Sequence, residues 1–175
     1  MTPTETALRQ RERVAVARLH ALLELLPTAL DQRMAPAGLT AFEYTLLEAL
    51  WEADAHRLRL SALASRTNAT LPRLSRVVTS LEKKGLVTRT PCAEDGRAFN
   101  AELTEAGIDR YLDTRPLHAD AVRAMILQDL SEDEVDQLAD VTLKILGRLD
   151  LRRRLAVTAC LADPVEACPA DPREA

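Results

Sequence analysis

Apolar residues recur at intervals of three and four positions through most of this chain, a spacing that predicts amphipathic helices. The first predicted helix covers residues 4–26, and Pro27 is expected to break or kink it. Its apolar side is wide for a single contact within the chain, so we expect this helix to face a partner molecule. That side is formed by Leu8, Ala15, Leu19, Leu22, Leu23 and Leu26.

The second predicted helix begins with a capping motif. Thr40 and Glu43 have the spacing of a capping box, in which each of the two side chains binds a backbone amide at the helix start. Leu39 and Tyr44 occupy the apolar positions that flank such a cap. Trp51, at the end of this helix, is interpreted as a core residue in preference to a ligand-stacking one.

A short strand and a short helix are predicted next. Residues 56–60 alternate between polar and apolar side chains, which favours a brief strand. Ser61 is a candidate N-cap for a helix over residues 62–67, and residues 68–70 are expected to form a turn.

The longer helix that follows has two distinct faces. Thr70 is expected to cap it, Pro72 lies in its first turn, and Gly85 is suited to the left-handed conformation that ends a helix. The inward face consists of Leu74, Val77, Val78 and Leu81. The side chains expected to point outward are Arg73, Ser75, Arg76, Thr79 and Ser80.

Two extended segments, residues 86–90 and 98–103, complete this middle region. Asp95 and Gly96 lie between them and form a hairpin turn signal. The order of elements predicts a helix-turn-helix followed by a two-stranded wing. Arg97, just past the wing tip, is placed to reach a minor groove or phosphates, and Asp95 is close enough to orient it.

Two more helices are predicted after the wing. The fifth begins near residue 104, with a kink expected at Pro116. The sixth begins at Ser131 and Glu134, a second capping box, and is expected to extend as far as Leu161. Residues 163–175 contain three prolines and no periodicity, so they are predicted to form a disordered tail.

Charge is distributed unevenly along the chain. The 175 residues carry a net charge of −4, yet nine basic and only three acidic side chains lie between residues 57 and 97. A basic segment between acidic ends is the pattern expected of a nucleic-acid footprint. On the outward helix face, arginine can bind guanine, and serine or threonine can bind phosphates or bases, so that face suits a DNA major groove. A solvated helix face without function is the alternative at this point.

Other function classes receive little support. The longest apolar runs fall short of a membrane span, and the N-terminal residues lack a signal-peptide core, so we expect a cytoplasmic protein without a membrane partner. The three histidines are scattered and the three cysteines lack metal-ligand spacing. We therefore predict no catalytic residues, no metal site and no cofactor, and the protein is not expected to be an enzyme.

Several short motifs together resemble the MarR family of bacterial transcriptional regulators. They are LEKKGLVTR at residues 81–89, DGRA at 95–98, LTEAG at 103–107 and LSEDE at 130–134, preceded by Leu39-Thr40 and Leu63-Ala64. The resemblance implies a mainly α fold with a small β-wing, in which a winged helix-turn-helix is combined with a helical dimerisation domain. Residues 1–39 and 104–162 would be the dimerisation segments, and residues 40–103 the DNA-binding domain.

The resemblance also implies a homodimer that binds a double-stranded DNA operator, as a repressor of pseudo-palindromic sites. The helix at residues 70–84 would enter the major groove, while Arg97 would enter the minor groove, held by Asp95. Arg89 would contact a phosphate. The predicted DNA-binding residues are Thr70, Pro72, Arg73, Ser75, Arg76, Thr79, Arg89, Asp95 and Arg97. Gly96 stands where the family usually has a basic residue.

A small hydrophobic or aromatic effector that relieves repression is a second implication of the resemblance. His20, Trp51 and Tyr111 could line its site, although a core or surface role is the simpler interpretation of each. Two alternatives stay open. Cys92, near Arg89 and Arg97, could be a redox-sensing thiol with Cys168 as its resolving partner. The winged helix could instead be a protein-interaction module that binds no DNA.

Overall fold

The computed structural model describes residues 7–92 and 98–150, and its helices and strands follow the predicted order. The element bounds are α1 (Gln10–Met34), η2 (Ala35–Ala37), α2 (Ala41–Trp51), η3 (Asp54–His56), β1 (Arg57–Arg59), α3 (Leu60–Arg66), α4 (Leu71–Lys83), β2 (Val87–Pro91), β3 (Phe99–Leu103), α5 (Glu105–Val122), η4 (Arg123–Leu127) and α6 (Glu132–Leu149). The predicted class, mainly α with a small β-wing, is confirmed.

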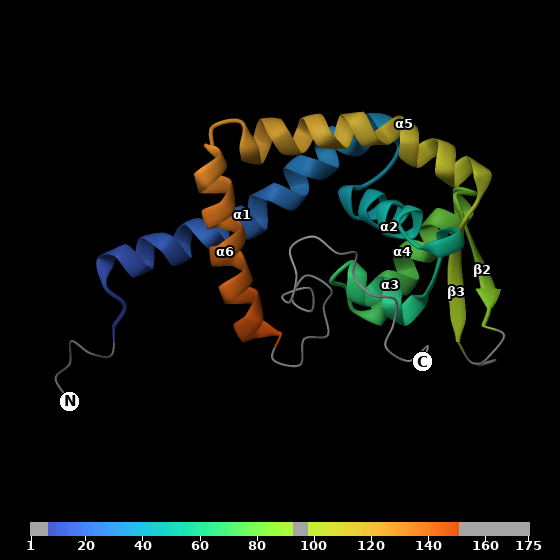
Figure 1. Cartoon of the computed structure of the whole chain (residues 1–175), viewed down its shortest axis with the longest axis horizontal. Coiled ribbons are helices and arrows are strands. Elements are labelled where there is room, and N and C mark those ends of the chain that lie inside the picture. Colours follow the sequence, from blue (N-terminus) through green and yellow to red (C-terminus); the bar gives the residue numbers. More distant parts are fainter. Residues whose placement is uncertain (1–6, 93–97, 151–175) are drawn as a thin grey trace.

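The long helix α5 connects two differently packed parts of the chain. Figure 1 shows α2, α3, α4 and the strands gathered beside the N-terminal half of α5, whereas α1 and α6 extend from its other half. The strands form one antiparallel sheet in the order β1-β3-β2, so the strand predicted at residues 56–60 joins the wing as a third strand. This sheet closes the helix-turn-helix on one side.

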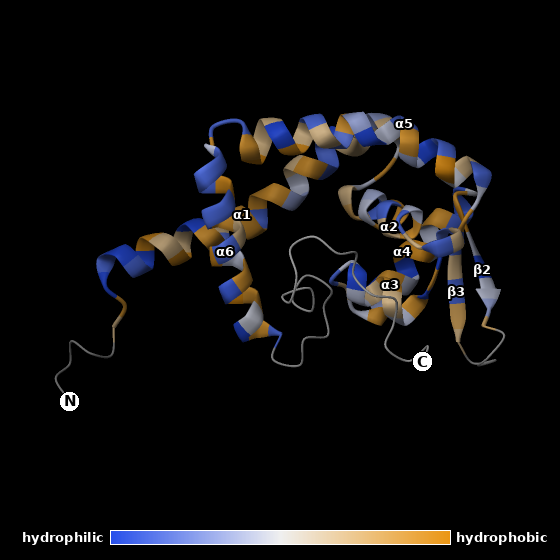
Figure 2. Cartoon of the chain, in the orientation of Figure 1, coloured by the Kyte–Doolittle hydropathy of each residue, from blue (hydrophilic) through white to orange (hydrophobic). Residues whose placement is uncertain are grey.

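The hydrophobic core lies almost entirely in the compact part. Its fully buried side chains come from the end of α1, from α2, α3 and α4, and from the strands: Met34, Tyr44, Leu46, Leu47, Leu50, Leu63, Leu74, Val78, Leu81 and Val87. By contrast, α1 buries only Met34 among its 25 residues, and α6 buries none. Figure 2 shows apolar residues on both helices nonetheless.

The two capping boxes and the end of α4 agree with the sequence prediction. Thr40 accepts a hydrogen bond from the amide of Glu43, whose carboxylate accepts one from the amide of Thr40 in return. Ser131 and Glu134 form the same pair at the start of α6. Gly85 has φ of 72° and ends α4 in a Schellman motif, in which its amide and that of Leu86 bind carbonyls of the last turn.

Neither proline ends its helix, so the break considered at Pro27 does not occur. Pro27 lies inside α1 and Pro116 inside α5. Each proline deprives the carbonyl four residues earlier of its partner, but those residues, Leu23 and Leu112, are exposed, so water can replace the lost bond. The irregular turn of the α5 region lies later instead, at the π-helical η4, where the amide of Gln128 binds the carbonyl of Arg123.

Two predicted N-caps were wrong in their chemistry. The helix α3 begins directly from β1 at Leu60, so Ser61 lies inside its first turn and caps nothing. Thr70 does hold the N-cap position of α4, but its side chain makes no capping hydrogen bond. Pro72, the second residue of α4, has no amide to donate, which removes one of the two bonds that such a cap can make.

The first turn of α5 rests directly on the end of α4. Thr104 donates its hydroxyl hydrogen to the carbonyl of Gly85 at 2.7 Å and its amide to the carbonyl of Leu86 at 3.1 Å. Gly107 faces the same carbonyl so closely that a Cβ atom would lie 2.0 Å from its oxygen. Only glycine allows this contact, which fixes the position of α5 on the winged domain.

We expect Gly107→Ala to lower the free energy of unfolding by about 1–3 kcal/mol, because the new methyl group must push α5 away from Leu86. Gly147→Ala is the matched control, since a Cβ there meets no atom within 4 Å and alanine favours a helix interior. Urea unfolding at one fixed protein concentration measures both variants. Equal stability of Gly107→Ala and the wild type would contradict the packing described above.

Candidate nucleic-acid interface

The helix-turn-helix is formed by α3 and α4 with a tight turn between them. Thr67 donates its hydroxyl hydrogen to the carbonyl of Leu63, and the amide of Ala69 binds the carbonyl of Ala64. Asn68 adopts the left-handed conformation with φ of 53°, as asparagine does in such turns. Arg66 donates to the carbonyl of Ala49 in α2, which ties the turn to the core. The second helix therefore has a fixed orientation.

The two predicted faces of α4 are present. Leu74, Val78 and Leu81 are buried, and Val77 packs against the same core. Pro72, Arg73 and Arg76 are exposed, while Ser75 and Thr79 are half-buried. The exposed face is available to a groove, and the five predicted site residues on it lie within about two turns of the helix.

The two arginines of this face are turned toward their own domain. The guanidinium of Arg73 lies 4.1 Å from the centre of the Phe42 ring in α2, a cation–π contact. Arg76 donates its Nε hydrogen to the carbonyl of Pro72 at 3.3 Å, so its side chain follows the helix toward the N-terminus. Both side chains are exposed and long enough to change these contacts when a partner binds.

Arg89 has a structural role that sequence analysis missed. From β2 it reaches α4, where Nη2 donates to the carbonyl of Ser75 at 2.6 Å and to the hydroxyl of Thr79 at 2.9 Å. Its Nε lies 3.4 Å from the carboxylate of Glu82. The guanidinium thus holds the wing strand against α4. The phosphate contact predicted for Arg89 would have to be made by this same guanidinium.

A buried carboxylate is the second feature that the sequence did not reveal. Glu43 was identified only as a capping residue, yet it also accepts hydrogen bonds from Lys84 at 2.7 and 2.8 Å and from Ser80 at 2.8 Å. Ser80 was expected to face outward, and this expectation was wrong because its hydroxyl binds Glu43. Lys84 also donates to the carbonyl of Gly38 at 2.9 Å. The end of α4 is therefore tied to the start of α2.

The partners of Glu43 determine its protonation. Burial alone would raise the pKa of this carboxyl, but the hydrogen bonds from Lys84, from the amide of Thr40 and from Ser80 outweigh it, and the pKa is lowered from its ordinary value of 4.5. Glu43 is therefore charged at neutral pH. Its side chain is only 5% exposed, whereas that of Lys84 is 37% exposed.

Asp95 and Arg97, the predicted wing-tip pair, lie outside the described residues, and so do Gly96 and Cys168. The other predicted DNA-binding residues are all on α4, just before it, or on β2. The described structure thus brings Thr70, Pro72, Arg73, Ser75, Arg76, Thr79 and Arg89 to one side of the winged domain.

Aromatic residues form one cluster at the junction of α2 and α5. The ring centres of Tyr44 and Tyr111 are 5.6 Å apart, Trp51 lies 5.5 Å from Tyr111, and His118 stacks on Tyr44 at 4.0 Å. Burial lowers the pKa of His118 and raises that of Tyr44, whose hydroxyl donates to Glu48. The interpretation of Trp51 as a packing residue agrees with these contacts.

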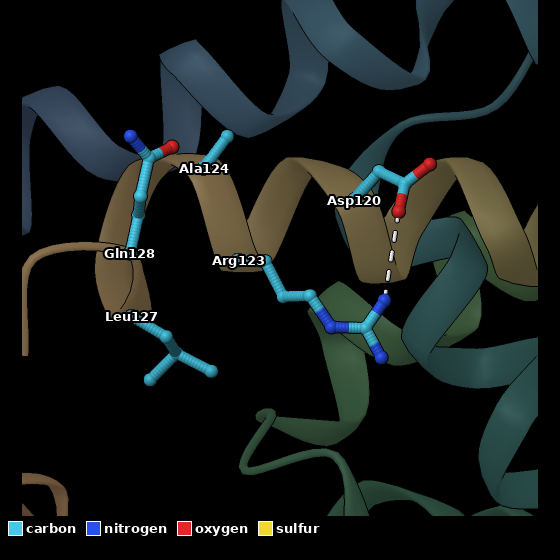
Figure 3. A pocket seen from close by; sticks show the side chains of 5 residues that line it. All are labelled: Asp120, Arg123, Ala124, Leu127 and Gln128. Carbon is cyan, nitrogen blue, oxygen red and sulfur yellow. Dashed lines mark ion pairs between the residues drawn. The ribbon is translucent and has the colours of Figure 1, made fainter. Parts of the chain in front are cut away.

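The three residues suggested for an effector site do not converge. Trp51 and Tyr111 are in contact, but His20 is exposed on α1. An open depression exists at the far end of α5, where Asp120 pairs with Arg123 beside Ala124, Leu127 and Gln128 (Figure 3). None of the three suggested residues lines it.

Among the described residues, Arg59 is a neighbour of Cys92 that the sequence did not suggest, whereas Arg97 lies outside them. The thiol is only 9% exposed, and Arg59 of β1 donates to its sulfur at 3.2 Å. Burial of this degree is typical of structural cysteines, which react slowly with oxidants. The geometry therefore adds no support to the redox alternative.

Within residues 7–92 and 98–150, no three His, Cys, Asp or Glu side chains converge as they would around a metal ion. Over the same ranges, no helix combines the length and the apolar character required to cross a membrane.

Comparisons with known proteins agree on one family. The family model for MarR matches residues 39–99. The HTH-type transcriptional repressor YetL of Bacillus subtilis is 31% identical over 128 residues, which cover 73% of this chain and 72% of YetL. Sco3205 of Streptomyces coelicolor, a MarR family regulator solved in complex with DNA, is 32% identical with a TM-score of 0.78, covering 82% of this chain and 94% of Sco3205.

A more distant structure shares the fold alone. The organohalide-sensing regulator RdhR-CbdbA1625, solved with 2,4-dichlorophenol bound, is 16% identical with a TM-score of 0.68 and covers 95% of both chains.

We expect Glu43→Gln to lower the free energy of unfolding by about 1–2 kcal/mol at pH 7, because glutamine can keep the cap but leaves Lys84 without its counter-ion. A lowered pKa means that the native ion pair adds stability above pH 4.5 and loses it as the pH falls through the folded-state pKa. The stabilities of variant and wild type should therefore converge in acid, as measured by urea unfolding from pH 7 to pH 3.

Glu134→Gln is the control for this comparison. Glu134 forms the same capping box at the exposed start of α6, but its hydrogen bonds come from Ser131 alone. This variant should change the stability less at pH 7. A constant difference between wild type and Glu43→Gln down to pH 3 would show that the ion pair with Lys84 does not stabilise the fold.

Proposed function

The chain belongs to the MarR family of winged helix-turn-helix transcriptional regulators, and we propose that it acts as a homodimeric repressor of a pseudo-palindromic operator. It is a DNA-binding transcriptional regulator of MarR type, and YetL, one of its relatives, is a repressor. The finer assignment, to a repressor that binds as a dimer and responds to an effector, is the proposal developed here.

The observation that carries the proposal is the exposed, basic face of α4. Arg73 and Arg76 are exposed on it, and Arg89 lies beside it, within the segment whose net charge is opposite to that of the whole chain. Major-groove readers present one helix in this way, with phosphate contacts around it. Sco3205, at 32% identity, was solved in complex with DNA. These facts favour DNA over the protein-interaction module.

The predicted site follows from this placement. We propose that residues 70–84 enter the major groove, where Thr70, Pro72, Arg73, Ser75, Arg76 and Thr79 lie along the interface. Arg89 and the wing-tip residues Asp95 and Arg97 would contact phosphates or the adjacent minor groove. For Arg89 to contact a phosphate, its guanidinium must hydrogen-bond to α4 and to the DNA backbone at the same time.

The homodimer is supported by the unpacked helices. Leu22, Leu23 and Leu25 of α1 are each more than half exposed, and α6 exposes Val141 and Leu149 to a similar degree. Apolar surface of this extent on helices that bury at most one residue is typical of an obligate interface. We therefore assign residues 1–39 and 104–162 to dimerisation. Sedimentation should give a mass of twice 19.3 kDa, and a monomer would contradict the assignment.

Relief of repression by a small hydrophobic or aromatic effector is the regulatory part of the proposal. The aromatic cluster of Tyr44, Trp51, Tyr111 and His118 lies where α5 meets the winged domain, so a ligand there could alter the position of α4. We expect aromatic acids or hydrophobic drugs to release the operator in a mobility-shift assay. Undiminished DNA binding with all of them would argue against this part alone.

Operator binding should weaken steeply with salt, with a log–log slope of about −5 if each subunit neutralises about three phosphates.

Operators are first selected from genomic fragments with the purified protein. We expect Arg76→Ala to weaken the selected site by about 1–3 kcal/mol and to relax its base preference, because arginine in a major groove reads guanine. Fluorescence anisotropy at several salt concentrations gives both quantities.

Arg123→Ala is the matched control, since Arg123 is exposed at the start of η4, away from α4, and pairs only with Asp120 among the described contacts. Its affinity and salt slope should equal those of the wild type. Salt-independent binding, or an Arg76→Ala protein with unchanged sequence preference, would contradict the proposed groove contact.

A further inference from the structure

The first turn of α4 exposes a large apolar side chain that is not part of the hydrophobic core. Leu71 is 52% exposed, and Pro72 beside it is also exposed. In the described part of the winged domain, Phe99 is the other large apolar side chain with comparable exposure, and it lies on β3. The remaining exposed leucines, isoleucines and valines belong to α1, α5, α6 and the segment before α1.

The polar side chains around Leu71 are engaged within the protein. Arg73 stacks on Phe42, and Arg76 binds the carbonyl of Pro72. Ser75 and Thr79 both receive hydrogen bonds from Arg89. Besides the N-cap Thr70, the side chains that project from the start of α4 without a described contact are those of Leu71 and Pro72, which can neither donate nor accept a hydrogen bond.

The setting of this apolar pair decides what it can bind. Recognition helices of the helix-turn-helix class present their N-terminal residues to base edges in the major groove. The exposed basic side chains of Arg73 and Arg76, which follow the pair in the first two turns of α4, favour a polyanion over an apolar protein surface. The apolar group that a DNA major groove displays is the 5-methyl group of thymine, which contacts aliphatic side chains.

We propose that Leu71, with Pro72 beside it, reads a thymine methyl group in each half-site of the operator. This inference rests on the proposed DNA-binding function and names a specificity-determining residue for it. The contact is one of shape and desolvation, so it selects thymine over cytosine without a hydrogen bond. It also gives the first turn of α4 a role distinct from that of Arg76 in the second turn.

The test replaces thymine by deoxyuridine, which lacks only the methyl group, at each thymine position of the selected operator in turn. One symmetric pair of positions should weaken wild-type binding by about fourfold per half-site, the effect of one buried methyl-sized group. For Leu71→Ala the same replacement should have no effect, because the side chain that covers the methyl group is gone. Leu71→Met, which keeps an apolar side chain of similar reach, should retain the sensitivity.

Urea unfolding confirms that Leu71→Ala is folded, and its salt slope should equal that of the wild type since no charge is removed. If no thymine methyl affects binding, or if Leu71→Ala keeps the full sensitivity, this inference is overturned while the proposed function stands. If the wild type binds no DNA in a salt-dependent manner, the proposed function fails and this inference fails with it. The two failures are therefore distinguishable.

Discussion

The orientation of α4 depends on a charged carboxylate held inside the protein. Glu43 is almost completely buried, and a buried charge is tolerated only when hydrogen bonds and a counter-ion replace water. Lys84, Ser80 and the amide of Thr40 supply them. Because these partners come from the end of α4 and the start of α2, neither helix can turn without leaving a charge unsatisfied. Apolar packing alone would allow small rotations at lower cost.

Two further constraints fix the same helix at other points. Arg89 in the wing donates a hydrogen bond to α4. The close contact between Gly107 in α5 and the carbonyl of Leu86 holds α5 against the residues that follow α4. The middle of α4 is thus connected to the wing, and its end to the long helix that leads toward α6. A change in the position of α5 is transmitted to α4 through these contacts, which is a physical route by which ligand or partner binding could alter DNA affinity.

Local sequence patterns predicted the elements well, whereas contacts between distant residues escaped them. The capping boxes, Gly85 and the inward face of α4 follow from spacings of a few residues, and all are present. The partners of Ser80 and Lys84 lie about forty positions away in the chain, so no local periodicity reveals them. The effect of the prolines could not be predicted for a related reason. Whether a lost backbone hydrogen bond ends a helix depends on the access of water to the unpaired carbonyl, and that access is a property of the folded chain.

The π-helical turn η4 has a consequence for how relatives of this chain can diverge. Such a turn accommodates one residue more than a regular helix would, and here it ends the α5 region, with the short connection of residues 128–131 between it and α6. Deleting a single codon within it would restore a regular helix and move the start of the connection by one residue, about 100° around the axis of α5. One small genetic event at this point could therefore change the direction in which the chain leads from α5 to α6 while the winged domain stays intact. With the proposed dimer interface on α6, such a step would produce paralogues that no longer assemble with one another although their DNA-facing helices are unchanged.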